Sequence, residues 1–406
     1  MKKLNRKKIV FITPFYPIKH RNDLFEDTKA VYYLLKSFAK ENDVLIIHSF
    51  MHGFKYAWKK LTSVIPIKVH YKDFLHVDDY GNNVLFFENL LLLPKSIKTF
   101  QYFNKKYAEL FNSYCIEEEY CPEIGVVHFP TYYVDFLGSV KKFPKTIAVL
   151  HSFDIKNIKT RKNIEYWKGY FKNFTSIGFR SYVIKKEFEN IFGYVDNTFM
   201  CLSGIPEEYI SIELKDSTYN ISDNINIIFA GRLDHNKNVA KSILALDKIK
   251  KKVKFSFTIV GDGEEKKNLE EMTLKFRLED QINFTGKISR EKTFKLMQKA
   301  DIFIMVSKKE TLGLVYLEAM AAGCLVIGTK GQGIDGIIVD GENGFLTDSS
   351  DENTIYQTID RVINLSPNEQ RKIRENAKNT VKSLSDTSLS KEYYSNICSV
   401  IREDNW

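Results

Sequence analysis

The sequence lacks the features that mark a secreted, membrane-spanning or zinc-binding protein. Its five cysteines form no CxxC pair and have no zinc-ligand spacing, so we expect free thiols in a reducing cytosol. No apolar run reaches the roughly 18 residues that a spanning helix needs. The nearest, Val84 to Pro94, is interrupted by Glu88 and Asn89. The first apolar run, Ile9 to Thr13, is too short for a signal peptide and is closed by Pro14.

Glycine-rich nucleotide loops are also missing where they would be expected. The loop after the first predicted strand, residues 14–23, contains no glycine. The segment Gly331 to Gly336 matches G-x-G-x-x-G, but no Asp or Glu ends a following strand about 20 residues further on. Glycines that allow a tight turn explain this match better than a dinucleotide site.

The length and charge of the chain limit its possible number of domains and its type of partner. Its 406 residues predict two domains or more, and 44% hydrophobic with 27% charged residues is typical of a globular chain with ample core. Residues 1–205 hold 31 Lys+Arg against 20 Asp+Glu, a charge of +11, and the rest holds 29 against 31, a charge of −2. The basic half is rich in Phe and Tyr. It suggests an anionic partner (a membrane surface, a lipid phosphate or a nucleic acid) or a solvated basic surface.

The first half alternates strands with helices, which predicts a doubly wound parallel sheet. We expect a helix over 25–40, and strands over 9–13, 44–48, 125–129, 146–150, 176–179 and 197–202. His151 directly follows a strand, at the carboxyl end where such sheets bind ligands, although a lone histidine is more often structural. The aromatic and basic clusters Phe54–Lys60 and Phe100–Tyr107 predict amphipathic helices, either on a membrane face or, more commonly, packed on a sheet.

The second half repeats this rhythm after a polar linker at 207–224. Expected strands and helices alternate as strand 225–230, helix 239–250, strand 255–260, helix 269–278, strand 282–285, helix 290–300, strand 301–307 and strand 325–329. The charged segment 366–382 is expected to be a solvated surface helix, and 390–402 a last helix. We therefore place one α/β domain at 1–206 and a second at 225–385, followed by a terminal helical segment at 386–406.

The stretch Glu310 to Gly323 is the candidate centre of the second domain. A strand runs into it, a helix follows at three- and four-residue apolar spacing, and Gly323 is placed to end that helix. Glu310 lies in the loop and Glu318 in the helix. Helix N–H groups can approach an anion, and two carboxylates can accept hydrogen bonds from a polyhydroxylated ligand. A buried strand-helix-strand unit with two solvated glutamates fits the spacing equally well.

Four short motifs follow the expected strands of this domain, and the carboxyl ends of parallel strands share one edge of the sheet. The motifs are Gly231-Arg232, Gly261-Asp262, Gly286-Lys287 and Glu310. Arg232 and Lys237 can therefore meet the helix start at Gly313. Two cations with helix N–H groups form a diphosphate site that needs no metal. The chain also has no Asp-x-Asp, the pattern that a metal-dependent nucleotide-sugar enzyme would use.

With these motifs the second half resembles the retaining nucleotide-sugar glycosyltransferases of group 1 (glycosyltransferase family 4). The resemblance is specific over about residues 225–360 and loose over the first half. It rests on Ala230-Gly-Arg-Leu with Lys237-Asn, Ile259-Val-Gly-Asp-Gly263, Phe284-Thr-Gly286, Ala300-Asp-Ile-Phe-Ile304, Ser307, Glu310-x7-Glu318, Glu318-Ala-Met-Ala-Ala-Gly323 and Asp340-Gly-Glu-Asn-Gly344.

The resemblance implies the GT-B fold, in which two Rossmann-like domains with doubly wound parallel sheets face each other across a cleft. The first would bind the acceptor and the second the donor, and the last helix would cross back to the first. The reaction would transfer a sugar from a UDP- or GDP-sugar with retention of configuration, without metal or other cofactor. The basic first domain then suggests a glycan or polyprenyl-diphosphate-linked acceptor at the inner membrane face, as in capsule or lipopolysaccharide assembly, and no nucleic-acid partner.

The resemblance also implies residue roles. Arg232 and Lys237 would stabilise the leaving diphosphate, Glu310 would contact the donor sugar near the reacting carbon, and His151 would face that sugar. Glu318 would bind the ribose hydroxyls. The remaining donor-binding residues would be Leu312, Gly313 and Leu314 through their amides, Lys287 and Ile288 near the base, and Gly231, Gly261 and Asp262 in the neighbouring loops.

Three departures from the family pattern bear on function. The usual Gly-Phe after the first glutamate is Thr311-Leu312, and the usual Gly-Gly-x-x-Glu turn is Gln332-Gly-Ile-Asp-Gly336, without the glutamate. The first-strand loop, Pro14-Phe-Tyr-Pro, replaces a Gly-Gly, so no residue of that loop is assigned to the diphosphate. These departures leave two alternatives open: a catalytically impaired nucleotide-binding protein, and a GT-B epimerase or phosphorylase.

Overall fold

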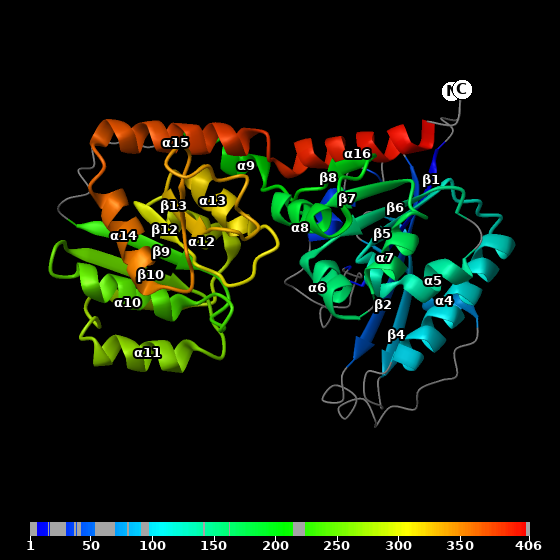
Figure 1. Ribbon diagram of the computed structural model, residues 1–406, viewed down its shortest axis with the longest axis horizontal. Helices are drawn as coiled ribbons and strands as arrows, with labels where there is room; N and C mark the ends of the chain where they lie inside the picture. The colour runs from blue at the N-terminus through cyan, green and yellow to red at the C-terminus, as the bar shows by residue number, and fades with distance from the viewer. Residues whose placement is uncertain are drawn as a thin grey trace. The chain divides into compact units, whose positions relative to one another are not determined.

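The computed structural model describes residues 6–14, 16, 30–35, 38, 42–52, 70–78, 81–90, 97–140, 143–161, 163–213 and 224–402. The chain divides into two compact units (Figure 1). The first comprises residues 1–180, 184–201 and 390–406, and the second comprises residues 181–183 and 202–389. Most of the expected linker, residues 214–223, lies outside the described residues, as do the cluster Phe54–Lys60 and most of the first-strand loop.

Within the described part of the first unit, eight strands form one sheet in the order β3-β4-β2-β1-β5-β6-β7-β8. Neighbouring strands are parallel except for the pair β3 and β4. The predicted strands are confirmed, and β3 and β4 are additional. Their bounds are β1 Lys8–Thr13, β2 Asp43–His52, β3 Leu75–Val77, β4 Asn83–Leu90, β5 Ile124–His128, β6 Thr146–Leu150, β7 Ser176–Phe179 and β8 Thr198–Met200.

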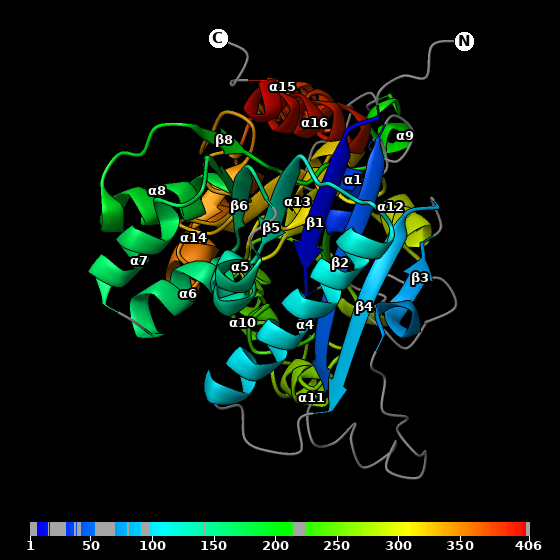
Figure 2. The ribbon, with the colours of Figure 1, turned by 90° about the vertical axis from the view of Figure 1, so that its right-hand side faces the viewer.

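Helices cover both faces of this sheet. One core layer joins its strands to α4 (Ile97–Glu117) and α5 (Val134–Ser139), and Figure 2 shows α4 crossing the strands. The other joins them to α1 (Ala30–Leu35) and the last helix, α16 (Asp386–Arg402). Three further helices pack beside β6 and β7: α6 (Ser152–Arg161), α7 (Ile164–Phe171) and α8 (Tyr182–Phe192). Two short 3-10 turns, Tyr71–Phe74 and Pro130–Tyr132, complete this unit. Tyr107, from the second aromatic cluster, is buried against the sheet, as the commoner alternative predicted.

Within the described part of the second unit, six parallel strands form a sheet in the order β11-β10-β9-β12-β13-β14. The central strands β12 and β13 are fully buried, as expected of parallel strands covered on both faces, whereas β11 at the sheet edge is mostly only half-buried. Their bounds are β9 Ile225–Ala230, β10 Phe255–Val260, β11 Ile282–Gly286, β12 Ile302–Ile304, β13 Leu325–Thr329 and β14 Phe345–Thr347. The doubly wound parallel fold predicted for this half is confirmed.

Figure 1 shows α10 and α11 on one side of this sheet and α13 and α15 on the other. The helices are α9 Glu207–Ile210, α10 Val239–Ile249, α11 Lys266–Lys275, α12 Arg290–Met297, α13 Leu314–Ala322, α14 Glu352–Ile363 and α15 Pro367–Lys382. Helix α9 occupies the start of the expected linker and packs on α13, with Tyr209 buried.

Two sequence-based expectations for this unit are wrong. Helix α15 is not simply a solvated surface helix, because it packs on α13 with Ile373, Arg374 and Val381 buried. Its many charges hide an apolar stripe at helical spacing. Helix α11 ends at Lys275 and not near residue 278, because Arg277 has a left-handed backbone (φ 53°) that stops the helix.

No helix in the described part of the chain is both long and apolar enough to cross a membrane.

Candidate functional site

The loops that follow the strands of the second unit meet at one edge of its sheet. β9 and β10 are in register through Ala230 and Val260, so the loops begin side by side. The amide of Gly231 donates to the carbonyl of Val260 at 3.0 Å, and that of Gly261 donates to Gly286 at 3.0 Å. The structure thus brings the predicted glycine motifs together.

Lys237 and Glu310 form the central contact of this edge. Lys237 Nζ lies 2.5 Å from Glu310 Oε2, and the two side chains are only 19% and 16% exposed. Lys237 is placed by an Asx turn, in which Asp234 Oδ1 accepts from the amides of Asn236 and Lys237. The sequence predicted that Lys237 and Arg232 meet the helix start at Gly313, and in the structure Lys237 forms an ion pair with Glu310 in the loop before that helix.

The backbone around Glu310 is held from two sides. Asn236 Nδ2 donates to the Lys309 carbonyl at 2.7 Å, and its Oδ1 accepts from the Lys309 amide at 3.0 Å. From the other side, Gln332 Oε1 accepts from the Glu310 amide at 3.0 Å, and the Gly333 amide donates to the Glu310 carbonyl at 2.9 Å. Glu310 is therefore a fixed group on an otherwise irregular loop.

This packing explains the glycine-rich segment 331–336. A Cβ at position 333 would lie 2.1 Å from the carbonyl oxygen of Thr311, so only glycine allows this approach. The segment forms a tight turn, as the sequence favoured, and the turn supports the Glu310 loop.

Helix α13 begins beside the ion pair. Gly313 precedes it with a left-handed backbone (φ 80°), and a Cβ there would come within 3.1 Å of Glu310 Cγ. The first turn carries no acidic side chain, and Leu312 just before it is buried. Lys237 and the partial positive charge of the helix start thus lie near the same loop, which favours an anion there.

Glu318 lies one turn further into α13 and is 8% exposed as a side chain. The pKa of its carboxyl is raised, because the effect of burial exceeds the opposing effect of the neighbouring Arg290 guanidinium. Arg290, from α12, reaches Glu318 Oε1 with Nη2 at 2.5 Å and Nε at 2.6 Å. The two glutamates therefore have different partners.

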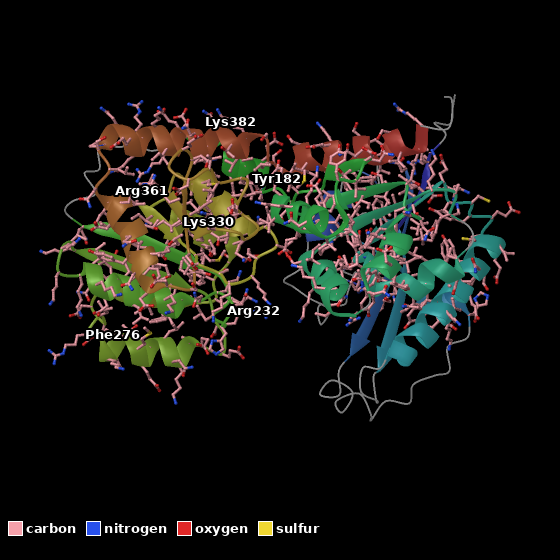
Figure 3. All side chains as sticks on the ribbon, viewed as in Figure 1. Tyr182, Arg232, Phe276, Lys330, Arg361 and Lys382 are labelled. Carbon is pink, nitrogen blue, oxygen red and sulfur yellow. The ribbon has the colours of Figure 1, made fainter. Side chains whose placement is uncertain are left out.

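The other predicted residues of this unit lie at its surface. Arg232 is 65% exposed, 3.9 Å from Asp234, and Figure 3 shows it at the surface of the second unit. Asp262 and Lys287 are exposed, and Ile288 is half-buried. Arg232 and Lys237 have different acidic neighbours, Asp234 and Glu310.

His151 belongs to the first unit, at the carboxyl end of β6, and is buried. Its Nε2 lies 3.2 Å from His128 Nδ1, and the Phe129 ring stacks on it at 3.6 Å. Burial lowers the pKa of both imidazoles well below the usual value, so both are neutral near pH 7. The His151 amide donates to Asp154, whose carboxyl has a pKa raised by burial to about 7.

Among the described residues, no group of three or more His, Cys, Asp or Glu side chains is arranged to hold a metal ion.

Sequence reasoning missed three side chains of the second unit that shape this site: Asn236, Arg290 and Gln332. Asn236 stands inside the motif between Arg232 and Lys237, which could have drawn attention to it. In the sequence, Arg290 has the pattern of an exposed residue at the start of a helix. Gln332 lies in a segment that was interpreted only through its glycines. Only the packing of separate loops shows their contacts.

Comparison with known proteins finds a family model that matches part of this chain. Residues 211–380 match the family model described as "Glycosyl transferases group 1". The N-acetyl-alpha-D-glucosaminyl L-malate synthase of Bacillus anthracis is 32% identical over 166 residues, 40% of this chain and 42% of that protein. The alpha-monoglucosyldiacylglycerol synthase of Streptococcus pneumoniae is 31% identical over 115 residues, 28% of this chain and 26% of that protein. These alignments span less than half of the curated relatives' length.

Solved structures match nearly the whole chain and confirm the GT-B fold. The sucrose-phosphate synthase of Thermosynechococcus elongatus has a TM-score of 0.70 at 16% identity, covering 97% of this chain and 99% of that one. Anabaena Alr3699/HepE in complex with UDP and glucose has a TM-score of 0.66 at 16% identity, covering 97% and 100%.

Proposed function

We propose that this protein transfers a sugar from a UDP- or GDP-sugar to a glycan or lipid-linked acceptor, with retention of configuration, because residues 211–380 match the family model of the group 1 glycosyltransferases. The bond between the anomeric carbon and the diphosphate oxygen breaks. An acceptor hydroxyl oxygen then bonds to that carbon on the face that the diphosphate leaves, and its proton passes to the departing diphosphate.

The observation that carries this proposal is the Lys237–Glu310 pair beside the start of α13. A leaving diphosphate gains negative charge, and a half-buried cation with helix amides stabilises that charge more than bulk water does. Arg232, exposed and not held by a short ion pair, can turn onto the phosphates when the donor binds. Protein cations fill the role that a metal ion plays elsewhere, so we expect activity without metal.

Each glutamate has its own task in this proposal. Glu310 lies with the phosphate-binding cation and contacts the donor sugar next to the reacting carbon. Glu318 accepts hydrogen bonds from the ribose hydroxyls, and the loop with Lys287 and Ile288 lies near the base. The amides of residues 312–314 bind sugar and phosphate oxygens. In the first unit, neutral His151 hydrogen-bonds a sugar hydroxyl.

The acceptor and location follow from the chain's charge and from its relatives. The basic first half suits an anionic lipid surface. A relative from Campylobacter jejuni, 27% identical over 177 residues, is named for transfer to a diNAcBac-PP-undecaprenol-linked glycan. We propose a polyprenyl-diphosphate-linked or glycan acceptor, in cell-surface polysaccharide assembly such as capsule or lipopolysaccharide. The protein would act in the cytoplasm, at the inner membrane face.

A screen of UDP- and GDP-sugars by thermal shift, with EDTA present, tests the donor side. A true donor should raise the melting temperature and release nucleoside diphosphate, and a donor at 100 times its Kd stabilises by about 2.7 kcal/mol. Arg232→Ala and Glu318→Ala should abolish most of the turnover. Binding of no nucleotide sugar, or full activity in both variants, would refute the proposal.

Product analysis separates the alternatives. Proton NMR of the new linkage should show the donor's anomeric configuration, and inversion would refute retention. Epimerised UDP-sugar without acceptor, or glucan cleavage by inorganic phosphate, would replace transfer by another GT-B activity. Co-sedimentation with anionic vesicles, reversed by salt, tests the membrane contact, and failure to co-sediment would remove it.

A further inference from the structure

Glu318 is held by Arg290, a residue outside the sequence motifs described above. Nε of Arg290 donates to Oε1 of Glu318 at 2.6 Å, and Nη2 lies 2.5 Å from the same oxygen in the ion pair. Arg290 stands at the start of α12 and Glu318 in α13, two helices that pack together. The second carboxylate oxygen, Oε2, receives no hydrogen bond from Arg290.

Aromatic rings hold the guanidinium in place. Arg290 lies over the ring of Tyr209, with its central carbon 5.6 Å from the ring centroid. That ring stacks on Phe294, one turn along α12, with centroids 3.9 Å apart and planes at 11°. Tyr209 comes from α9, so three helices fix the guanidinium. An arginine at a helix start, 38% exposed, would otherwise sample several rotamers.

We propose that Arg290 is a positioning residue for nucleotide binding: it orients Glu318 so that Oε2 is presented to the ribose hydroxyls. This inference rests on the proposed function and adds a residue to it. A carboxylate that accepts from two hydroxyls must be ionised and correctly turned. Arg290 favours the ionised form because its positive charge balances the buried carboxylate. It also fixes the orientation of the carboxylate, because it binds only Oε1. The stack of Phe294 and Tyr209 makes that orientation available before the ligand arrives.

A simpler reading is that Arg290 only neutralises a buried carboxylate and so contributes to stability. The two interpretations predict different ratios between the Kd of the 2′,3′-dideoxy nucleotide and the Kd of the natural nucleotide. If Glu318 binds ribose, the protein should prefer UDP or GDP to the 2′,3′-dideoxy nucleotide by roughly 10- to 100-fold. If Arg290 orients Glu318, its loss should reduce that preference, whereas a purely stabilising role would leave it unchanged.

The experiment measures the Kd of UDP, GDP and their 2′,3′-dideoxy forms by calorimetry, on the full chain. The variants are Arg290→Met, Arg290→Lys and Glu318→Gln. Lys295→Met is the matched control, because it removes one cation and one ion pair from the same helix at an exposed site. Thermal unfolding confirms that each variant is folded, and Arg290→Lys serves if Arg290→Met is not.

The ribose preference is the Kd of the dideoxy nucleotide divided by the Kd of the natural one. We expect this ratio to fall close to one in Glu318→Gln and Arg290→Met. Arg290→Lys should retain part of the preference, and Lys295→Met should retain all of it. A preference lost in Glu318→Gln but intact in both Arg290 variants would overturn this inference and leave the proposed function standing. A wild-type protein without any ribose preference would also overturn it. Absence of all nucleotide binding would instead refute the proposed function.

Discussion

The Lys237–Glu310 pair offers a sharp test of the proposed site, through a double-mutant cycle with Lys237→Met and Glu310→Gln. Removing one member of a fully buried pair costs about 3–5 kcal/mol, whereas exposed pairs contribute about 0–1 kcal/mol. With the side chains 19% and 16% exposed, each single change should lower the unfolding free energy by about 1–3 kcal/mol. The double variant should be no less stable than the worse single variant, because no unpaired charge remains.

The effects of these substitutions on turnover should differ from their effects on stability. Lys237→Met removes a group that we propose to stabilise the leaving diphosphate, so kcat should fall by about 10²–10³-fold. Glu310→Gln should lower kcat more than it weakens donor binding, because the proposal places Glu310 next to the reacting carbon. The two effects should be strongly non-additive in kcat/KM, as expected of residues that act as one unit.

Circular dichroism is the suitable probe of unfolding, because residues 202–389 contain no tryptophan. Lys241→Met is a useful control, since Lys241 is paired with Glu352 in the same unit and not with Glu310. Strict additivity of the two changes, in both stability and kcat/KM, would show that the pair is not a functional unit.

Three further predictions follow. Arg232→Ala should leave the melting temperature within about 1 °C, because the side chain is exposed, yet lower kcat by about 10²-fold. Gly333→Ala should push the Thr311 carbonyl outward, lower stability by about 1–3 kcal/mol and remove most turnover; wild-type kinetics in this variant would contradict this. Burial raises the pKa of Asp154 to about 7, so its contribution to stability is present near pH 4 and is lost as the pH rises through 7. The wild type should therefore lose up to about 4 kcal/mol relative to Asp154→Asn over that range in urea titrations, and parallel curves would refute this.

Sequence reasoning located the second unit's strands and the edge where its motifs meet. Parallel strands such as Ile225–Ala230 are largely apolar runs, interrupted here by Asn226, and their carboxyl ends must share an edge. That rule alone joins Gly231 to Gly261. It cannot give side-chain partners. Whether Lys237 reaches Glu310 depends on the turn made by Asp234, which local sequence only partly determines.

Other parts could not be predicted because their contacts are distant in sequence. Arg290 and Glu318 are 28 positions apart on separate helices, and each alone is typical of a solvated surface. His151 and His128 meet only because β5 and β6 are neighbours, so a pair of buried imidazoles appeared as two isolated histidines. The first half was harder to read, because aromatic and basic residues mix on its helices without a clear period.

The two-sided hold on the Glu310 loop has a consequence for local motion. Three consecutive amides of this irregular segment are all bonded: Lys308 to the Asn236 carbonyl, Lys309 to the Asn236 side chain and Glu310 to Gln332. Residues 308 and 309 are nevertheless exposed to solvent. Their amide hydrogens should thus exchange slowly, as in a strand, and should open only when the turn around Gln332 or the loop around Asn236 opens. The Glu310 carboxylate would then be carried on a loop that opens rarely, although the loop belongs to no strand.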